Sequence, residues 1–408
     1  MRQKILLLLT LLAVCPVLRA QDFDRWFTGG TLRIDCLREG LAQGDTVWVE
    51  HWIDRRSDWH GSRTHLLDPF DNGDYRVELR DHLSGRVLYS RCFSNLFREY
   101  KDTPEGKTEK ARFEETFLVP MPRAAVTVAL QKRDSRLRFV DQTVTTFTPA
   151  PDRMTQAKSA ATAEAYEWHG DPGKMLDVAM VLQGFEECGA AELEQVKRRM
   201  VGVLFGKEPF RSHRDDFNVY FVRGDAGVEY NTFGADRYAM TFKLWQLHDV
   251  LGTTPCDHII IVLNNEKYGG GAIYNFYSVS SLHKMAESVL PHELGHGIGG
   301  LADEYVDEEL SYADLHRTHY EPLEPNITNL VDFDSKWKRL LKKGTPVPTP
   351  ENRKVARTEN GPLGVYEGAG YSNKGVYRPA MHCMMRDYAP FCPVCRERLE
   401  AVIGLYTK

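Results

Sequence analysis

Residues 291–305 hold side chains whose types and spacing suit a catalytic metal site. The segment reads Pro-His-Glu-Leu-Gly-His-Gly-Ile-Gly-Gly-Leu-Ala-Asp-Glu-Tyr. On an α-helix, His292 and His296 lie one turn apart and point the same way, so both imidazoles can reach one Zn²⁺ at about 2.0–2.1 Å. Glu293 is turned off that axis, where it can take a proton from an activated water and later deliver it to a leaving amine. A chance His-Glu-x-x-His is expected only about 0.03 times in 408 residues with 14 histidines. The segment therefore predicts a hydrolytic centre with one catalytic zinc ion and Glu293 as its general base.

A catalytic zinc needs a third protein ligand and an open fourth position. In one zinc-hydrolase pattern a glycine ends the helix and the third ligand follows three residues later. Counting from Gly299 reaches Ala302, which cannot bind a metal, whereas counting from Gly300 reaches Asp303. We predict Asp303 as the third ligand and Glu304 as the alternate. If neither is a ligand, the pair would support the ligands or hold a structural cation.

The histidines require a helix packed on one face. The sequence before and within the motif supplies an apolar stripe at helical spacing, made of Leu282, Met285, Val289, Leu290, Leu294 and Ile298. Pro291 is discordant, because a proline inside a helix removes a hydrogen bond and kinks the chain. The alternative is that Pro291 begins a fresh helix at its first position.

Beyond residue 174 the chain alternates between strand and helix patterns. Strands are expected at 176–182, 217–222 and 258–263, and helices at 191–204 and 240–251. Residues 268–274, rich in glycine, suit a strand at the rim of a cleft where an extended substrate adds by backbone hydrogen bonds, or else a flexible surface loop. This order predicts an α/β or α+β domain.

The N-terminal part has a different pattern. From about 31 to 148, short runs alternate apolar and polar residues, with a hairpin turn expected at 81–85, which indicates antiparallel strands. Residues 149–173 have the small, polar composition of a linker. We therefore predict an all-β sandwich over 21–148, a linker over 149–173 and an α/β (α+β) catalytic domain of the zincin type over 174–408.

Residues 1–20 read as a secretory signal peptide. Arg2 and Lys4 precede an apolar run that is too short to span a bilayer, and Ala20 ends a small-residue cleavage site. A periplasmic or extracellular protein is expected, and lipoprotein processing at Cys15 is the weaker alternative because its neighbours suit that chemistry poorly.

The composition and net charge limit the classes of binding partner that the protein is expected to have. Hydrophobic residues make up 42% and charged residues 27% of the chain, with a net charge of −5. These values argue against a disordered chain or a multi-span membrane protein, and against nucleic acid or stable membrane insertion. A protein or peptide substrate fits better, while the sequence gives no indication of the oligomeric state.

The C-terminal cysteines allow three interpretations. Without Cys15, seven cysteines remain, so at least one is unpaired. Cys383, Cys392 and Cys395, near His382, favour a structural disulfide, with a second Zn²⁺ site or unpaired thiols as alternatives. Nothing in the sequence supports Ca²⁺.

Other residues are weaker candidates for the site. Met384 and Met385 suit a methionine turn beneath the zinc, although methionine as ordinary core filler fits equally well. Tyr305, Tyr371 and Tyr388 are candidates to donate to the tetrahedral oxyanion or to support the ligands, and each also suits simple packing.

The chain resembles the IgA-specific metalloendopeptidase family, zinc peptidases found in gut bacteria, over roughly 174–408. The resemblance includes the His-Glu-Leu-Gly-His and Gly-Leu-Ala-Asp-Glu-Tyr runs and continues at residues 268–270, 325–328, 365–371, 377–379, 383–385 and 391–395. The N-terminal sandwich resembles the accessory domain that often precedes that catalytic domain. The resemblance implies a zincin fold, endopeptidase activity, zinc ligation by His292, His296 and Asp303, and Glu293 as general base. The substrate does not carry over, so a host immunoglobulin or another glycoprotein is only a candidate.

Two rival functions use the same residues. One is a secreted surface binding protein with a degenerate zinc domain, which the intact His292, Glu293 and His296 disfavour. The other is a zinc hydrolase for non-peptide amides such as cell-wall links, which the motif chemistry alone does not distinguish from a peptidase.

Overall fold

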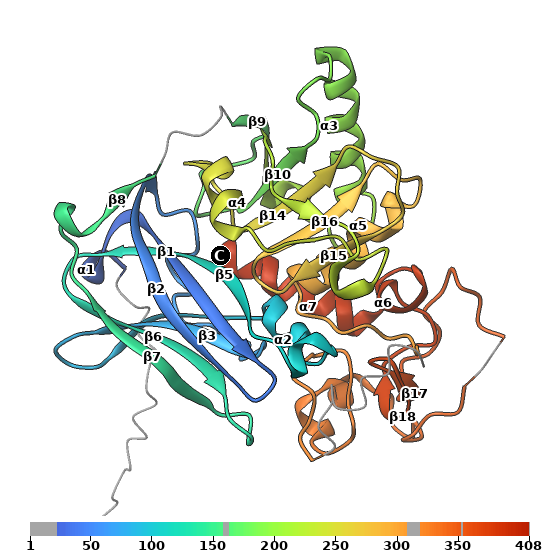
Figure 1. Cartoon of the computed structure of the whole chain (residues 1–408). Coiled ribbons are helices and arrows are strands. Elements are labelled where there is room, and N and C mark those ends of the chain that lie inside the picture. Colours follow the sequence, from blue (N-terminus) through green and yellow to red (C-terminus); the bar gives the residue numbers. More distant parts are fainter. Residues whose placement is uncertain (1–22, 158–162, 308–318, 352–353, 408) are drawn as a thin grey trace, which may run out of the picture.

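The N-terminal domain is a β-sandwich of two four-stranded sheets (Figure 1). The computed structural model describes residues 23–157, 163–307, 319–351 and 354–407. One sheet has the order β5-β1-β2-β8 and the other β4-β3-β6-β7. The bounds are β1 Phe27–Leu41, β2 Gly44–Asp58, β3 Tyr75–Asp81, β4 Val87–Phe93, β5 Ala111–Pro122, β6 Val126–Arg133, β7 Phe139–Phe147 and β8 Thr155–Gln156, with short helices α1 Phe23–Trp26 and α2 Leu96–Tyr100.

The alternation in these strands produces the sandwich, because every second side chain points inward. Ile34 on β1 and Leu130 on β6, for example, are buried in one apolar core. The expected hairpin is confirmed, since β3 and β4 pair antiparallel around the turn in which the Gly85 amide donates to the Asp81 carbonyl at 2.8 Å.

The second domain is built on a six-stranded sheet with the order β15-β16-β14-β10-β11-β9. Its four central strands are parallel, and both edge strands run antiparallel to their neighbours. The predicted α/β organisation is confirmed. The bounds are β9 Glu164–Glu167, β10 Leu176–Gln183, α3 Ala190–Leu204, β11 Phe217–Arg223, β12 Val228–Glu229, β13 Met240–Thr241, α4 Leu244–Leu251, β14 His258–Leu263, β15 Gly270–Ile273, β16 Tyr277–Ser281, α5 Ala286–Gly297, β17 Tyr366–Ala369, β18 Ser372–Arg378, α6 Met384–Asp387 and α7 Pro393–Tyr406.

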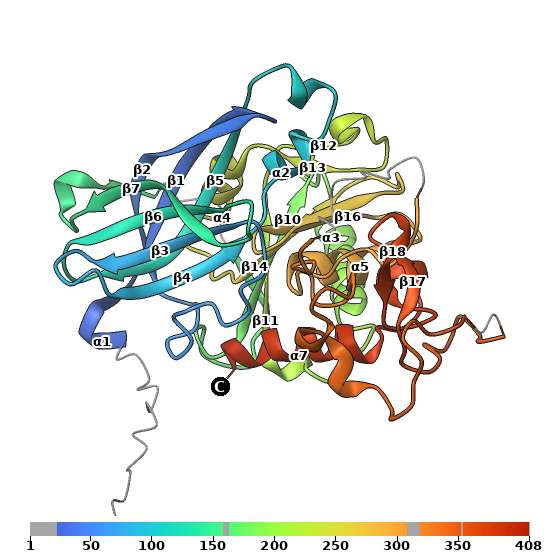
Figure 2. The same cartoon turned by 90° about the horizontal axis from the view of Figure 1, so that it is seen from below.

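The two faces of this sheet are both buried, against different neighbours. On β10, Ala179 and Val181 belong to a core shared with α4 and the sandwich, whereas Met180 and Leu182 belong to a core shared with α3, α5 and α7. Figure 2 shows the sandwich beside the α/β domain and α7 running along its outer side. Because the central strands are covered on both faces, they read as continuous apolar runs.

Three local expectations need correction. The predicted helix at 240–251 begins only at Leu244, because Met240 and Thr241 form strand β13 with β12. Pro291 does not start a helix but lies inside α5. The predicted linker contributes β8 to the sandwich and β9 to the central sheet, so it is not a plain tether.

The glycine-rich segment forms an edge strand, as expected, and that edge is already paired at Gly270. Outside β16, the Gly270 amide donates to the Arg237 carbonyl at 3.2 Å, and the Gly270 carbonyl accepts from the Ala239 amide at 3.1 Å. Farther along, the Ser94 amide donates to the Tyr274 carbonyl. The loop alternative is therefore wrong, and direct addition of an extended substrate is blocked at Gly270.

Several contacts fix the sandwich against the catalytic domain. The Asn275 side chain donates to the Cys92 carbonyl at 2.6 Å, and the Asn72 side chain donates to the Gly300 carbonyl at 3.0 Å. The Phe276 ring packs against Phe93 with 5.4 Å between centroids. Because Gly300 belongs to the turn after the histidine helix, the sandwich helps to position the site.

Glu99 on α2 gives the domain interface a pH dependence. Burial raises the pKa of Glu99 to about 7, against the opposing effects of the Tyr238 hydroxyl, Arg98 and His296, and Asp102 raises it further. A carboxyl group with a raised pKa in the folded state destabilises the fold as pH rises, because the unfolded chain deprotonates first. As pH rises from 5 to 8, the free energy of unfolding of Glu99→Gln should therefore increase by about 2 kcal/mol relative to that of wild type. Urea unfolding at both pH values measures this difference, and a difference that does not change with pH would contradict it.

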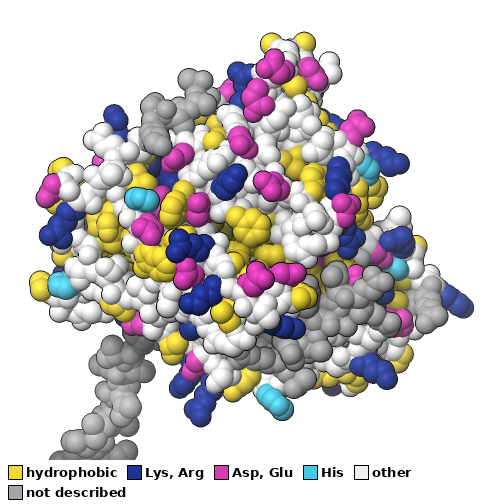
Figure 3. Space-filling view, viewed as in Figure 1, with side chains coloured by type: hydrophobic (Ala, Val, Ile, Leu, Met, Phe, Trp, Pro, Cys, Tyr) yellow, Lys and Arg dark blue, Asp and Glu magenta, His cyan; other side chains and the backbone are white. Residues whose placement is uncertain are grey.

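In the parts of the chain that the structure describes, no helix combines the length and apolar character needed to cross a membrane. The expected signal peptide at 1–20 lies outside the described residues. On the face seen in Figure 3, acidic and basic side chains are interspersed, with hydrophobic groups between them near the middle of the view.

Candidate metal centre

Helix α5 carries both histidines of the motif and lies between the sheet edge and the C-terminal elements. It packs on β15 and β16 on one side and on α3 and α6 on the other. Leu290 and Leu294 are fully buried, which fixes the rotation of the helix about its axis. That rotation turns His292 and His296 toward the turn that follows α5.

The two histidines and Asp303 converge at one point. His292 Nε2 lies 3.2 Å from His296 Nε2, and Asp303 Oδ1 lies 3.1 Å from His292 Nε2 and 3.4 Å from His296 Nε2. Ligand atoms at 2.0–2.1 Å from a tetrahedral zinc lie about 3.3 Å from one another. The three spacings thus match those around a single zinc ion.

Hydrogen bonds determine which imidazole nitrogens face this point. His292 Nδ1 lies 3.0 Å from the Met384 carbonyl oxygen, and His296 Nδ1 lies 2.7 Å from the Leu301 carbonyl oxygen. Since a carbonyl only accepts, each Nδ1 carries the proton and each neutral ring turns the lone pair of Nε2 inward. Asp303 Oδ1 is buried without a hydrogen-bond partner. With both rings neutral, three electron-rich atoms face one another and a cation between them would satisfy all three, so these residues fit a metal ion.

The turn after α5 brings Asp303 back to the helix. Gly300 has a φ of +59°, in the left-handed region that favours glycine, and its amide donates to the His296 carbonyl. The Asp303 carbonyl accepts from the Gly370 amide at 2.9 Å. Tyr371 donates its hydroxyl proton to Asp303 Oδ2, which leaves Oδ1 directed at the histidines. Although burial opposes it, the two histidines, when protonated, hold the pKa of Asp303 well below its usual range.

Glu293 lies beside the convergence point and against strand β15. A Cβ atom on Gly270 would lie 3.3 Å from Glu293 Cγ. Burial raises the pKa of Glu293, and His292, His296 and Arg237 oppose that rise. A desolvated carboxylate at this position is suited to accept a proton.

The two methionines lie beneath the histidine helix, and both are fully buried. A Cβ atom on Gly295 would lie 2.4 Å from Met385 Sδ, so Met385 packs directly against α5. Met384 supplies the carbonyl that orients His292, as described above. The pair thus forms a floor under the site.

Glu304 points away from the histidines. Its Oε1 accepts from the Asn326 side chain at 2.9 Å and from Cys395 Sγ at 3.2 Å. Cys383 Sγ and Cys395 Sγ are 3.7 Å apart, far beyond the 2.03–2.05 Å of a disulfide. All cysteines in the described part of the chain are free thiols, so the expected disulfide is wrong.

The three candidate tyrosines have different surroundings. Tyr371 binds Asp303, and the Tyr305 ring packs edge-on against Tyr371 at 5.3 Å. The Tyr388 ring stands edge-on to His292 at 5.6 Å, and its hydroxyl lies 2.8 Å from the hydroxyl of Tyr268. Of these three tyrosines, Tyr388 is the one whose hydroxyl lies on the His292 side of the site and is not hydrogen-bonded to Asp303.

Sequence reasoning missed Arg237 as a site residue. This exposed arginine lies within electrostatic range of Asp303, Glu293 and Tyr388. It precedes Tyr238 and Ala239, which pair with β15, and no local motif marks it. Only the pairing of residues 237–239 along the edge of the sheet brings it to the site.

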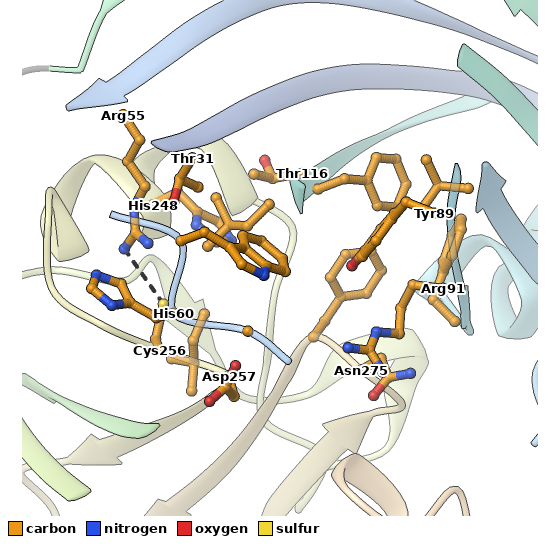
Figure 4. Close-up of a pocket in the computed structure, with 18 of the residues that line it drawn as sticks. Thr31, Arg55, His60, Tyr89, Arg91, Thr116, His248, Cys256, Asp257 and Asn275 are labelled. Atoms are coloured by element: carbon orange, nitrogen blue, oxygen red, sulfur yellow. Dashed lines mark hydrogen bonds between the residues drawn. The ribbon is translucent and has the colours of Figure 1, made fainter. Parts of the chain in front are cut away.

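A separate cavity of about 100 Å³ lies between the two domains (Figure 4). In it, Arg55 from the sandwich points toward Cys256, with 3.5 Å between its Nη2 and the sulfur, and His60 lies alongside. Burial and the Arg55 charge lower the pKa of His60 to about 4, so this histidine is neutral. None of the residues around the convergence point lines this cavity, which we interpret as part of the domain interface.

Two family models match the chain. A model described as IgA Peptidase M64 matches residues 221–362 and 355–403, and one described as Peptidase M64 N-terminus matches residues 22–143. None of the curated proteins compared with the chain matches it. The first model spans α5, the turn after it and the C-terminal floor, and the second spans nearly all of the sandwich. The chain therefore belongs to the IgA peptidase M64 family and is a metallopeptidase.

Proposed function

We propose that this protein is a secreted zinc endopeptidase that hydrolyses peptide bonds within a protein substrate. One observation carries the proposal. The Nε2 atoms of His292 and His296 converge with Asp303 Oδ1, which has no hydrogen-bond partner, and Glu293 lies beside them. His292, His296 and Asp303 would hold the zinc ion. When bound, the ion supplies Lewis-acid chemistry, which makes water acidic near neutral pH and polarises the peptide carbonyl.

Glu293 is the proton carrier in this proposal. Its half-buried carboxylate takes a proton from the attacking water and passes it to the nitrogen of the departing amine. The carbonyl groups of Met384 and Leu301 hold the two imidazoles in the tautomer that leaves Nε2 free to bind metal. The Tyr371 hydroxyl holds the Asp303 carboxylate in place. The substrate lies near Arg237, whose charge also stabilises negative charge that develops in the reaction.

We expect Tyr388→Phe to lower kcat by about 10²-fold with a much smaller change in KM, because loss of one oxyanion donor costs about that much. The Tyr388 hydroxyl is linked to Tyr268 and lies on the histidine side of the site. Tyr100→Phe is the matched control, because the Tyr100 hydroxyl donates to the Glu109 carbonyl within the sandwich. Steady-state kinetics on one peptide substrate measures both variants. Equal effects of the two changes would remove Tyr388 from this role.

The proposed activity is tested by profiling cleavage of a mixed secreted proteome by the purified mature protein. Internal cleavages should appear, disappear when a zinc chelator is added and return with added zinc. Glu293→Gln, tested in parallel, should yield none. Host immunoglobulins and other glycoproteins belong in the mixture as candidate substrates. Release of amides from cell-wall fragments without cleavage of proteins would instead support the cell-wall hydrolase, and binding without any cleavage would support the binding protein.

A further inference from the structure

A second group of metal-binding side chains lies directly behind the first. Glu304, Cys383, Cys392 and Cys395 are all fully buried, and one ligand atom from each lies within 4.8 Å of the others. Neither histidine of the motif takes part. The group joins the turn after α5, the start of α6 and the start of α7, which are distant in the sequence.

The spacings match a tetrahedral thiolate site. Around zinc with Zn–S distances of 2.3 Å, sulfur atoms lie about 3.8 Å apart. Cys383 Sγ and Cys395 Sγ are 3.7 Å apart, and Cys395 Sγ is 3.2 Å from Glu304 Oε1. Cys392 and Cys395 also have the Cys-x-x-Cys spacing typical of zinc sites.

Burial raises the pKa of Glu304, Cys383 and Cys395, and the surroundings offset part of the cost of charging them. Cys392 is the N-cap of α7 and Cys395 lies in its first turn, where the helix dipole stabilises thiolates. The Cys392 amide donates to Cys383 Sγ at 3.4 Å. Arg378 and Arg386 lie within electrostatic range of Glu304 and offset part of the charge of three thiolates and a carboxylate.

One atom of the cluster independently indicates a ligand. Glu304 is 0% exposed, yet its Oε2 has no hydrogen-bond partner. An unsatisfied buried carboxylate oxygen beside three thiols is costly, and a bound cation removes that cost.

We propose that Glu304, Cys383, Cys392 and Cys395 bind a second, structural zinc ion. The site would release the thiol protons on binding and leave no open position for a substrate. The second ion would also hold in place the chain segments that carry Asp303 and orient His292. Glu304 follows Asp303, and the Glu304 amide donates at 2.7 Å to the carbonyl of Met385, which adjoins the Met384 carbonyl that orients His292.

Metal analysis of the purified mature protein tests this proposal. The count of two ions includes the catalytic zinc of the proposed function, whereas the zinc kept by a variant without the two histidines does not. Wild type should hold two zinc ions per chain, and Cys395→Ala should hold one. Cys36→Ala, which changes a buried thiol in the sandwich, is the matched control and should keep two. A double variant, His292→Ala with His296→Ala, should also keep one zinc. If Cys395→Ala fails to fold, this double variant still shows whether the cysteine group binds zinc.

Cobalt(II) identifies which side chains hold the metal. Cobalt-loaded wild type and the double histidine variant should both show an intense near-ultraviolet band of thiolate-to-cobalt charge transfer, and Cys395→Ala should show a much weaker one. One zinc per wild-type chain without such a band would overturn the proposal. So would iron in place of zinc, or an unreduced chain lighter by two hydrogen atoms, which would mark a disulfide.

Discussion

Glu293→Gln should lower kcat for peptide hydrolysis by about 10²–10⁴-fold while the zinc content stays that of wild type, since general acid–base catalysis contributes about that much. Glu293 lies beside the point where the metal ligands converge but is not one of them. Glutamine keeps the shape of the side chain and cannot accept the proton. Kinetics on a defined peptide, with metal analysis of the same sample, measures both quantities.

The control for this change lies on the same helix. Glu287 is exposed in the first turn of α5, so Glu287→Gln should leave both kcat and zinc content unchanged. Loss of zinc from Glu293→Gln would mean that this residue helps to bind the metal. Full turnover by the variant would refute the mechanism, because another group would then have to carry the proton.

The grouping of His292, His296 and Asp303 was predictable because their spacing is local in the sequence. Helical periodicity places His292 and His296 on one face, and the count from Gly300 singles out Asp303. The left-handed φ at Gly300 shows why the count must begin there and not at Gly299, since the chain turns back at Gly300. Spacing alone could not show which way Glu304 turns.

The supporting residues were harder to predict because they come from distant segments. Tyr371 reaches Asp303 across 68 residues, and the Met384 carbonyl reaches His292 across 92. No periodicity links such positions. The cysteine spacing allowed both a disulfide and a metal site, and the approach of Glu304 to Cys395, which favours the metal site, could not be seen in the spacing. The free thiols remove the disulfide.

The fold, like the site, was predictable where it depends on local sequence patterns and not where it depends on contacts between distant segments. Continuous apolar runs marked the parallel strands, but the start of α4 was misplaced because Met240 continues the helical spacing of Leu244, Leu247 and Leu251. Tertiary contacts decide otherwise. The Thr241 amide donates to the Tyr277 hydroxyl, and the Thr241 carbonyl accepts from it at 2.8 Å. These bonds hold the chain extended where propensity alone favours a helix.

Asp303→Ala should abolish peptide hydrolysis and remove the catalytic zinc, in contrast to Glu293→Gln. Asp303 Oδ1 is the only anionic atom among the three that converge, and its loss leaves two imidazoles with a cavity in place of the carboxylate. Loss of a residue that only supports a ligand typically weakens metal binding by about 10–100-fold, so loss of a ligand should weaken it by more than about 100-fold. Zinc retained against a graded series of chelators measures the affinity.

Two further variants make this prediction specific. Tyr371→Phe removes the hydrogen bond to Asp303 Oδ2 and keeps the carboxylate, so it should weaken zinc binding by about 10–100-fold and retain activity at high zinc concentration. Glu304→Ala removes the neighbouring carboxylate, which faces the cysteines, so it should weaken binding of the second zinc while the metal that supports hydrolysis remains. If Glu304→Ala instead lost the catalytic zinc while Asp303→Ala kept it, the ligand would be Glu304. The turn after α5 would then have to rearrange when metal binds, because the structure directs Glu304 away from both histidines.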